Sequence, residues 1–433
     1  MKNIIKNSLI LCLGHQRYWK LDLWLKAIRI YVNRFFFAKN KININSKIQE
    51  QGANHIQLDV ENAQIFFGYY DHSPISNNGK ICLALKIDSP QKVTVFNKAK
   101  YSSKKAEVGY FDMCDPSLGF QRIGETSTWC WQQGARLRWF PEGEGLVIYN
   151  HQTDKGYGAV IQDLSGREIK RLSMPIYDLR NDGVLALTLN FARLHRMRPG
   201  YGYRNLPDAT EGDFCPEDDG VWLYDINKSE SRLLFSLQML SGYGPEPSMK
   251  EAEHYINHLS WNPSGEIFLF FHIWVNKGKR HTRLFTSSSS GNDLKILVSD
   301  SASHFCWMSD HEIVVVTTTE GRLSYKQFDI RSGKECSLET WTPHEDGHPS
   351  RFSDRYIITD TYPDKYGQQY LFLCDSEKQK ITTLADVYST PLSAGEVRCD
   401  LHPRVIPGSS DVCFDSVFSG RRTVNILNFS AVL

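Results

Sequence analysis

Five histidines stand at the same point of a repeated sequence pattern. The clearest copy runs from His258 to His272 and reads HLSWNPSGEIFLFFH: a short strand, a tight turn around Gly265 and an apolar strand, with a polar residue at each end. Imidazole binds divalent metals and exchanges protons near neutral pH, so several copies meeting at one point would form a metal or acid–base site. The other histidines at this point are His72, His304, His348 and His402.

The repeat itself predicts the elements that position these histidines. Its copies begin at seven places, namely His72, Arg136, Ile176, His258, His304, His348 and His402. Repeats of about 40–60 residues that contain several short strands are typical of β-propellers. The chain has 433 residues with 23 Phe, 20 Tyr and 10 Trp, which is ample for such a core. We therefore predict an all-β fold, a seven-bladed β-propeller over residues 64–433.

The register of the repeat predicts which residues share a rim of the propeller. In the clearest copy, His258 lies three residues before Trp261 and His272 lies eleven residues after it. The antiparallel strands of one hairpin bring these two positions to the same end, opposite the turn. The residues at the second position of the seven copies are Lys86, Asn150, Asn190, His272, Thr318, Asp360 and Asp415. We expect two polar rings around one channel mouth, which is typical of a ligand site. The alternative for any single histidine is a hydrogen bond within its own blade.

Three further segments combine side chains suited to an acidic sugar. They are FGYYDHSP with Tyr69, Tyr70, Asp71 and His72, WQQGARLRW with Gln133 and Arg136, and NFARLHRMRPGYGYRN with Arg193, Arg196, Tyr201 and Tyr203. Guanidinium groups bind carboxylates through two parallel hydrogen bonds, and tyrosine rings stack on sugars. Arg351 and Arg404, in the sixth and seventh copies, add to this polar set. The alternatives are core tyrosines in the first segment and a solvated basic turn in the third.

Charge and motifs argue against several classes of function. The net charge is +1, so no overall field attracts nucleic acid, and an anionic ligand must be bound by a local basic cluster. The sequence has no P-loop, no dinucleotide-binding fingerprint, no HExxH and no nucleophile elbow. Its ten cysteines form no CxxC pair, and several lie in apolar strands, which indicates a reducing, cytoplasmic location.

The first part of the chain differs from the repeats. Residues 1–45 are predicted to form a basic amphipathic helical segment, with apolar residues at helical spacing between positions 18 and 39 interleaved with Lys and Arg. We expect this segment to form a helix that packs against the propeller, and the alternative is that residues 18–39 lie on a membrane surface. No signal-peptide cleavage site follows the short apolar run near the start, and no stretch reaches the ~20 apolar residues that span a bilayer. Residues 46–63 are polar and are predicted to be a linker.

On these residues and motifs, the chain resembles the seven-bladed β-propeller polysaccharide lyases with TolB-like blades, of which oligogalacturonate lyases and ulvan lyases are members. The resemblance covers roughly residues 64–430 and is one of architecture with scattered motifs. It implies β-elimination on a uronate-containing oligo- or polysaccharide. In oligogalacturonate lyases, three histidines and a glutamine hold a divalent metal. The matching positions here are His258, His304, His348 and His402, with Gln133 as an amide ligand, and the metal implied is Mn or Ca.

The resemblance also implies roles for the other candidate residues. β-Elimination needs a cation that neutralises the uronate carboxylate, a base for the proton next to it and an acid for the leaving oxygen. The catalytic residues implied are His72, Tyr70, His258 and Tyr201. The substrate-binding residues implied are Tyr69, Gln133, Arg136, Asn150, Arg193, Arg196, Tyr203, His272, Arg351, Asp360 and Arg404. The assignment of base and acid among these histidines and tyrosines stays open.

Two other functions fit the same pattern. The first is a non-catalytic glycan-binding or scaffolding propeller that works beside bacterial surface-polysaccharide biosynthesis. The lack of an export signal favours it, because lyases of polymers are usually exported. The second is a protein-interaction propeller with no sugar chemistry.

Overall fold

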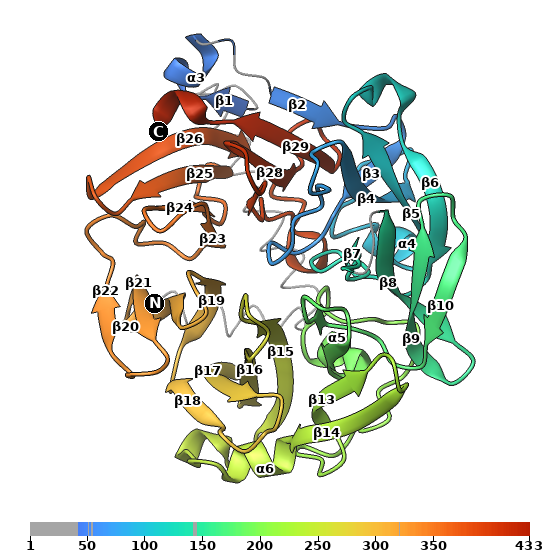
Figure 1. Ribbon diagram of the computed structural model, residues 1–433, viewed down its shortest axis with the longest axis vertical. Helices are drawn as coiled ribbons and strands as arrows, with labels where there is room; N and C mark the ends of the chain where they lie inside the picture. Colours follow the sequence, from blue (N-terminus) through green and yellow to red (C-terminus); the bar gives the residue numbers. More distant parts are fainter. Residues whose placement is uncertain (1–41, 51, 53–54, 142–144, 320) are drawn as a thin grey trace, which may run out of the picture.

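Seven antiparallel sheets form a ring of blades in the computed structural model (Figure 1). The structure describes residues 42–433, except 51, 53–54, 142–144 and 320. Within each blade the strands follow one another in sequence from the innermost to the outermost position. The all-β, seven-bladed propeller that the repeat predicted is confirmed, while the predicted helical extension lies mostly outside the described residues.

The first four blades each contain four consecutive strands. Blade 1 consists of β3 (Ala63–Phe66), β4 (Ile81–Asp88), β5 (Ala106–Asp112) and β6 (Gln121–Thr126). Blade 2 consists of β7 (Arg138–Trp139), β8 (Leu146–Thr153), β9 (Gly156–Asp163) and β10 (Glu168–Leu172). Blade 3 consists of β11 (Asp178–Leu179), β12 (Leu185–Thr188), β13 (Gly220–Asp225) and β14 (Glu230–Ser236). Blade 4 consists of β15 (Glu253–Trp261), β16 (Ile267–Asn276), β17 (Lys279–Ser288) and β18 (Lys295–Val298).

The last three blades complete the ring. Blade 5 consists of β19 (Ala302–Trp307), β20 (Glu312–Thr319), β21 (Arg322–Asp329) and β22 (Glu335–Ser337). Blade 6 consists of β23 (Ser350–Arg351), β24 (Tyr356–Asp360), β25 (Gln368–Asp375) and β26 (Lys380–Tyr388). Blade 7 takes from the C-terminal part of the chain β27 (Arg404–Val405), β28 (Asp411–Ser416) and β29 (Thr423–Asn428).

Two strands from the beginning of the described chain close the ring. β1 (Ile42–Ile44) pairs with β26 as a fifth strand of blade 6, and β2 (His55–Leu58) pairs with β29 as the outermost strand of blade 7. Figure 1 shows these blue strands beside the red C-terminal ones. The sequence predicted a polar linker over residues 46–63, and this stretch instead holds α3 (Ser46–Glu50) and β2. A strand of four residues is too short for its alternation to stand out from a loop.

Helices are few and lie between strands. Besides α3, the helices are α4 (Lys98–Ser102), α5 (Phe191–Met197) and α6 (Leu237–Gly242). The short 3-10 turns are η1 (Pro116–Leu118), η2 (Pro247–Met249), η3 (Gly395–Val397) and, after the last strand, η4 (Ser430–Val432). In the described part of the chain, no helix has the length and apolarity needed to cross a bilayer.

The inner strands repeat one backbone irregularity. Arg136, His258 and His402 stand at the same position of three copies of the repeat, and all three have left-handed backbone angles, with φ values of 53°, 54° and 47°. In blade 4 this residue interrupts the pairing of β15 with β16. Such conformations are uncommon for residues other than glycine, so their recurrence confirms that the register reflects a shared backbone turn.

Candidate functional site

Four of the predicted histidines meet on the propeller axis. His258 comes from β15, His304 from β19, and His348 and His402 directly precede β23 and β27. The ring centroids of His258 and His304 are 6.2 Å apart, those of His304 and His348 4.1 Å, and those of His348 and His402 4.4 Å. Four consecutive blades therefore deliver one imidazole each to a single cluster.

Three of these imidazoles are held through Nδ1. Each donates this N–H across 2.8 Å, in the contacts His304 to Asp346, His348 to Asp360 and His402 to the carbonyl of Gly68. A hydrogen bond at Nδ1 fixes the tautomer and leaves the lone pair of Nε2 available, which is the arrangement that orients histidine as a metal ligand or a base. In the described structure, Nε2 of His348 and Nε2 of His402 are buried and have no hydrogen-bond partner.

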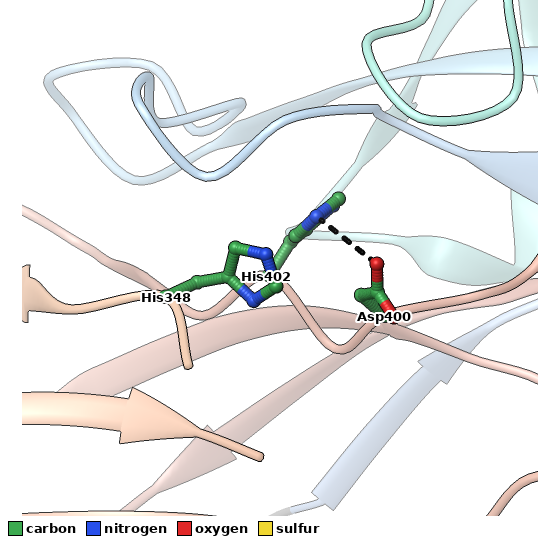
Figure 2. Close-up of side chains that lie close together, drawn as sticks. All are labelled: His348, Asp400 and His402. Carbon is green, nitrogen blue, oxygen red and sulfur yellow. Dashed lines mark ion pairs between the residues drawn. The ribbon is translucent and has the colours of Figure 1, made fainter. Parts of the chain in front are cut away.

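His348, Asp400 and His402 form a group that could hold a metal ion. One ligand atom of each lies within 4.8 Å of the others, and all three residues are buried (Figure 2). Oδ2 of Asp400 is 3.9 Å from Nε2 of His402, and Arg398 holds the same carboxylate through two hydrogen bonds of 2.7 Å. Two imidazole nitrogens and one carboxylate oxygen are suitable donors for a divalent transition metal. The unpartnered Nε2 atoms therefore fit the metal that the resemblance implies.

The other two predicted metal ligands lie beside this group. Nε2 of His258 faces the side-chain amide of Asn257 at 3.1 Å and the hydroxyl of Tyr69 at 3.5 Å. His304 lies against His348 but has no ligand atom in the group of three. Gln133, the predicted amide ligand, is buried behind His258, where it donates to Tyr177 and Asn257.

Tyr69 and Tyr70 fill the axis next to the histidines. They belong to a loop between β3 and β4 that leaves the sheet of blade 1. The ring of Tyr69 lies 5.1 Å from His258 and 4.9 Å from His402. The hydroxyl of Tyr70 donates to the carbonyl of Phe305 and accepts from its N–H, at 2.9 and 3.0 Å, so this loop is attached to blade 5 across the axis.

Arg404 holds the base of that loop. Its guanidinium donates to the carbonyls of Gly68 and Tyr69 and pairs with Asp415 at 3.1 Å, while the side chain is 1% exposed. All its hydrogen bonds are made to buried groups of the protein, so Arg404 does not bind substrate as predicted. It instead positions the loop that carries Tyr69.

A cavity of about 210 Å³, here called the histidine cavity, opens from the cluster to one face of the propeller. Its lining includes Arg198, His258, Arg280, His304, Asp346 and Tyr362. Arg198 stacks on the ring of Tyr201 at 4.0 Å and donates to its hydroxyl at 3.1 Å. Neither Arg198 nor Arg280 forms an ion pair with any described carboxylate. Two arginines without an ion-pair partner among the described residues therefore face a cavity whose lining also includes imidazoles and the carboxylates of Asp300 and Asp346.

The charge states of the cluster differ from one residue to the next. Burial lowers the pKa of His258, His304 and His402, which favours neutral rings. Burial also acts to lower the pKa of His348, but the ion pair with Asp360 outweighs it and the pKa is raised. Although burial opposes the shift, the neighbouring His304 lowers the pKa of Asp346 to about 2. Asp346 is therefore a stable carboxylate behind a neutral imidazole.

His72 and Arg136 lie away from the cluster, although the register placed them in the same ring. Nη2 of Arg136 is 2.6 Å from Nε2 of His72 and 2.7 Å from Asp71. The loop that inserts Tyr69 shifts His72 along the axis, because it adds residues before the strand resumes at Ile75. Arg351 lies on the same distant side, where it is exposed and pairs with Asp354 at 2.6 Å.

The basic segment after blade 3 is largely structural. Arg193 is 1% exposed and donates to the carbonyls of His254, Thr210, Asp213 and Phe214. Arg196 pairs with Asp208 at 2.9 Å and with Glu253 at 2.5 Å. Tyr203 is fully buried and stacks on Phe191 at 4.3 Å. The predicted aromatic platform is thus part of the core, and of this segment only Arg198 and Tyr201 reach the histidines.

The predicted second ring acts as a supporting layer. Asn150 bonds the backbone of Ile176 through both amide atoms, at 2.7 and 2.8 Å. Asp360 accepts from the ring and the backbone N–H of His348 and from the backbone N–H of His402. His272 pairs with Ile256 in the expected register, but its ring packs within blade 4 against His254 and Trp274. Asn150, Asp360 and His272 do not line the histidine cavity, whereas Thr318 of the same predicted ring does.

Sequence reasoning assigned no role in the site to several of its residues. They are Arg198, Asp346, Tyr362, Arg398 and Asp400. One signal was present: Asp-x-His occurs at Asp346–His348 and again at Asp400–His402, just before the inner strands of blades 6 and 7. Arg198 and Tyr362 carry no comparable repeat.

The comparisons with known proteins support the fold. The sequence matches no protein-family model, and no curated protein is significantly similar to it. Among solved structures, an oligogalacturonate lyase in complex with manganese matches with a TM-score of 0.60 at 12% identity, over 87% of this chain and 93% of that one. An oligogalacturonate lyase from Vibrio parahaemolyticus matches with a TM-score of 0.56 at 11% identity, over 90% and 98%. TolB from Acinetobacter baumannii matches with a TM-score of 0.39 at 12% identity, over 72% and 65%. At such identities the chain shares its fold with the two lyase structures, as the resemblance implied.

The burial of Arg193 predicts a loss of stability rather than of binding. Arg193→Met would leave several buried carbonyls without a donor, so we expect the free energy of unfolding to fall by about 3 kcal/mol or more. Arg196→Met, at the half-buried ion pairs, is expected to cost about 1 kcal/mol. Urea denaturation of the two variants measures both values. A stable Arg193→Met variant that has lost only sugar binding would show that this arginine contacts the ligand.

The histidine pair inside blade 4 predicts a pH-dependent stability. Nδ1 of His254 and Nε2 of His272 are 2.8 Å apart, and burial lowers the pKa of His254 to about 4 and that of His272 well below its usual value. The unfolded chain binds these protons at higher pH than the folded one, so the contribution of the pair is complete above about pH 6.5 and decreases as the pH falls towards 4. For His254 alone this amounts to about 3 kcal/mol.

Denaturation curves between about pH 7 and pH 4 test this pair, since the His254→Gln/His272→Gln double variant lacks both titrating groups. We expect the variant to lose less stability over this range than the wild type. Parallel curves for the two proteins would contradict the assignment.

Proposed function

We propose that the chain binds a uronate-containing oligo- or polysaccharide in the histidine cavity and cleaves it by β-elimination with the help of a divalent metal ion. The proposal rests on one observation: a group that could bind a metal ion lies next to two arginines that form no ion pair within the described structure. A buried His–Asp–His group with free Nε2 atoms lies beside a cavity whose two arginines, Arg198 and Arg280, have no described carboxylate partner. Such a site suits an anionic ligand that also contacts a metal.

The two arginines can neutralise the carboxylate of the substrate, which is the first requirement of β-elimination. The proton next to a carboxylate becomes acidic only when the carboxylate charge is neutralised. Arg198 is half-buried and already oriented by Tyr201, whereas Arg280 is exposed at the turn between β16 and β17. We assign Arg198 to the uronate at the reacting position and Arg280 to a neighbouring acidic residue of the saccharide.

His348, Asp400 and His402 would hold the metal ion. When bound, the ion supplies a Lewis acid that withdraws charge from the substrate carboxylate. Imidazole donors favour Mn over Ca, which prefers a shell made only of oxygen atoms. The manganese present in the first of the lyase structures supports the same choice. Asp360 and the carbonyl of Gly68 keep the two imidazoles in the required tautomer.

His304 is the best-placed base. Its Nδ1–H donates to Asp346, a carboxylate whose pKa is low, and this leaves Nε2 free to accept a proton in the cavity. Carboxylate–imidazole pairs of this kind orient general bases in many enzymes. Tyr362 is the corresponding acid, because burial raises the pKa of its hydroxyl and keeps it protonated. Tyr70, named from the sequence, has its hydroxyl engaged by Phe305 on both sides.

A lyase assay tests the proposal directly. The full-length chain is incubated with uronate-containing glycans, with Mn²⁺, with Ca²⁺ or with a chelator, and the unsaturated product is followed by its ultraviolet absorbance. We expect product with Mn²⁺, and a loss of about 10²–10³-fold in kcat/KM in Arg198→Met or His304→Asn. Arg171→Met, at an exposed arginine on the outermost strand of blade 2 that pairs with Glu168, is the matched control and is expected to keep full activity.

The same assay separates the alternative functions. Absence of product from every glycan, with and without metal, would eliminate the lyase. If the chain still binds these glycans and Arg198→Met weakens the binding, the site belongs to a non-catalytic glycan-binding propeller. Absence of both product and binding would leave a protein-interaction propeller.

Metal binding is a separate prediction. Titration calorimetry with MnCl₂ is expected to show one site per chain that His402→Ala abolishes, because one of three protein ligands is lost. Asp360→Asn is expected to weaken it by about 10–100-fold through the misoriented imidazole of His348. His72→Ala is the control histidine. Binding that survives His402→Ala unchanged would place the metal elsewhere.

A further inference from the structure

A second cavity lies on the opposite side of the propeller from the histidine cavity. Its volume is about 250 Å³, and it is here called the hairpin-face cavity because the turn Asn262–Pro263 between β15 and β16 lies at its edge. Its lining includes Tyr70, His72, Arg138, Asp178, Trp261 and Trp307. None of them lines the histidine cavity.

Two inner strands show that the cavities open on different faces. Along β15, His258 lines the histidine cavity, and Ser260 and Trp261, at the end of the strand, line the hairpin-face cavity. β19 likewise begins at the first cavity with Ala302 and ends at the second with Trp307. Tyr70 and its bonds to Phe305 lie between them on the axis. A saccharide in one cavity is therefore not continuous with the other.

The charges of the hairpin-face cavity are balanced. Arg138 pairs with Asp178 at 2.5 Å, and Asp71 pairs with the buried Arg136 at 2.7 Å. Burial lowers the pKa of His72 well below its usual value, so this imidazole adds no charge. This differs from the histidine cavity, whose arginines have no described carboxylate partner. The site therefore favours a ligand that is polar but uncharged.

Two indole N–H groups in the lining lack acceptors. Nε1 of Trp261 and Nε1 of Trp307 are buried, and neither has a hydrogen-bond partner in the described structure. The Trp261 side chain is 6% exposed, and a buried donor left unpaired costs about 1–3 kcal/mol. Tyr70 and Phe305 add aromatic rings to the same lining. Indole donors beside aromatic faces suit a sugar ring, whose oxygens accept hydrogen bonds and whose C–H face stacks.

We propose that the hairpin-face cavity is a second saccharide site, which binds one neutral pyranose ring. The ion-paired Arg138 and Asp178 offer fixed donors and acceptors to hydroxyl groups, and Trp261 and Trp307 offer indole N–H groups and stacking surface. A volume of about 250 Å³ lies just below the usual range of ~300–1,000 Å³ for ligand pockets, which fits a single ring. The proposal stands apart from the lyase reaction, because it uses none of the residues assigned to it.

The indole N–H groups are also the reporters for the test. The full-length chain is labelled with ¹⁵N-tryptophan, and the indole signals of Trp261 and Trp307 are assigned from Trp→Phe variants. Methyl glycosides of glucose, galactose and mannose are then titrated, with glucuronate as the charged probe. We expect at least one neutral glycoside to shift both signals saturably, and Trp307→Phe to weaken its binding about tenfold, as loss of one hydrogen bond would do.

Two matched variants control for indirect effects. Trp139→Phe removes a neighbouring indole that bonds to Pro74 outside the cavity, and Arg198→Met alters the histidine cavity; both are expected to leave neutral-sugar binding unchanged. The proposal is overturned if no neutral glycoside shifts these signals, if glucuronate binds more tightly than all of them, or if Arg198→Met abolishes the shifts. The lyase assay is unaffected by each of these outcomes, so the two proposals fail independently.

Discussion

The carboxylate of Asp360 connects two blades at the centre of the propeller. It accepts hydrogen bonds from the backbone N–H and the imidazole N–H of His348, at 2.7 and 2.8 Å, and from the backbone N–H of His402 at 3.0 Å. Hydrogen bonds to a buried charge contribute about 1.5–3 kcal/mol each, and loss of the acceptor leaves buried donors unpaired. The positions of His348 and His402, the two histidines proposed to hold the metal ion, therefore depend on this one side chain.

Other blades use the same interaction. Asn150 of blade 2 accepts from the backbone N–H of Ile176 at the start of the inner strand of blade 3, and Asp415 of blade 7 accepts from Phe67 of blade 1 at 3.4 Å. In each case a polar residue from the second strand of one blade binds the inner segment of the next. Three members of the polar ring that the register predicted, Asn150, Asp360 and Asp415, thus join neighbouring blades.

One of these contacts holds a residue with strained backbone, His402. The left-handed angles of Arg136, His258 and His402 each cost of the order of 1–3 kcal/mol and persist only where the surroundings determine them. His402 is held by Asp360 through its N–H and by Gly68 through its ring. This turn directs the side chain towards the axis, so the strain is part of how the blades converge on one cluster.

Periodicity was sufficient to predict the fold and the four histidines that meet. It could not show the loop that inserts Tyr69 and Tyr70, because this loop interrupts the register and carries His72 away from the cluster. Side-chain direction was equally hidden: His272 pairs with Ile256, two residues before His258, but its ring packs inside blade 4. The basic segment around Arg193 illustrates a third limit, since composition does not distinguish a guanidinium that bonds buried carbonyls from one that faces a cavity. Among the arginines of this segment, Arg198 is the one that has no ion-pair partner in the described part of the chain.

The divalent metal ion that we propose would lie at the axis between blades 6 and 7. Crystals soaked in MnCl₂ and measured at the manganese absorption edge test this proposal most directly. The account predicts one strong anomalous peak within coordinating distance of Nε2 of His348, Nε2 of His402 and a carboxylate oxygen of Asp400. A manganese peak bound only at other residues, with these atoms unliganded in saturated crystals, would contradict it.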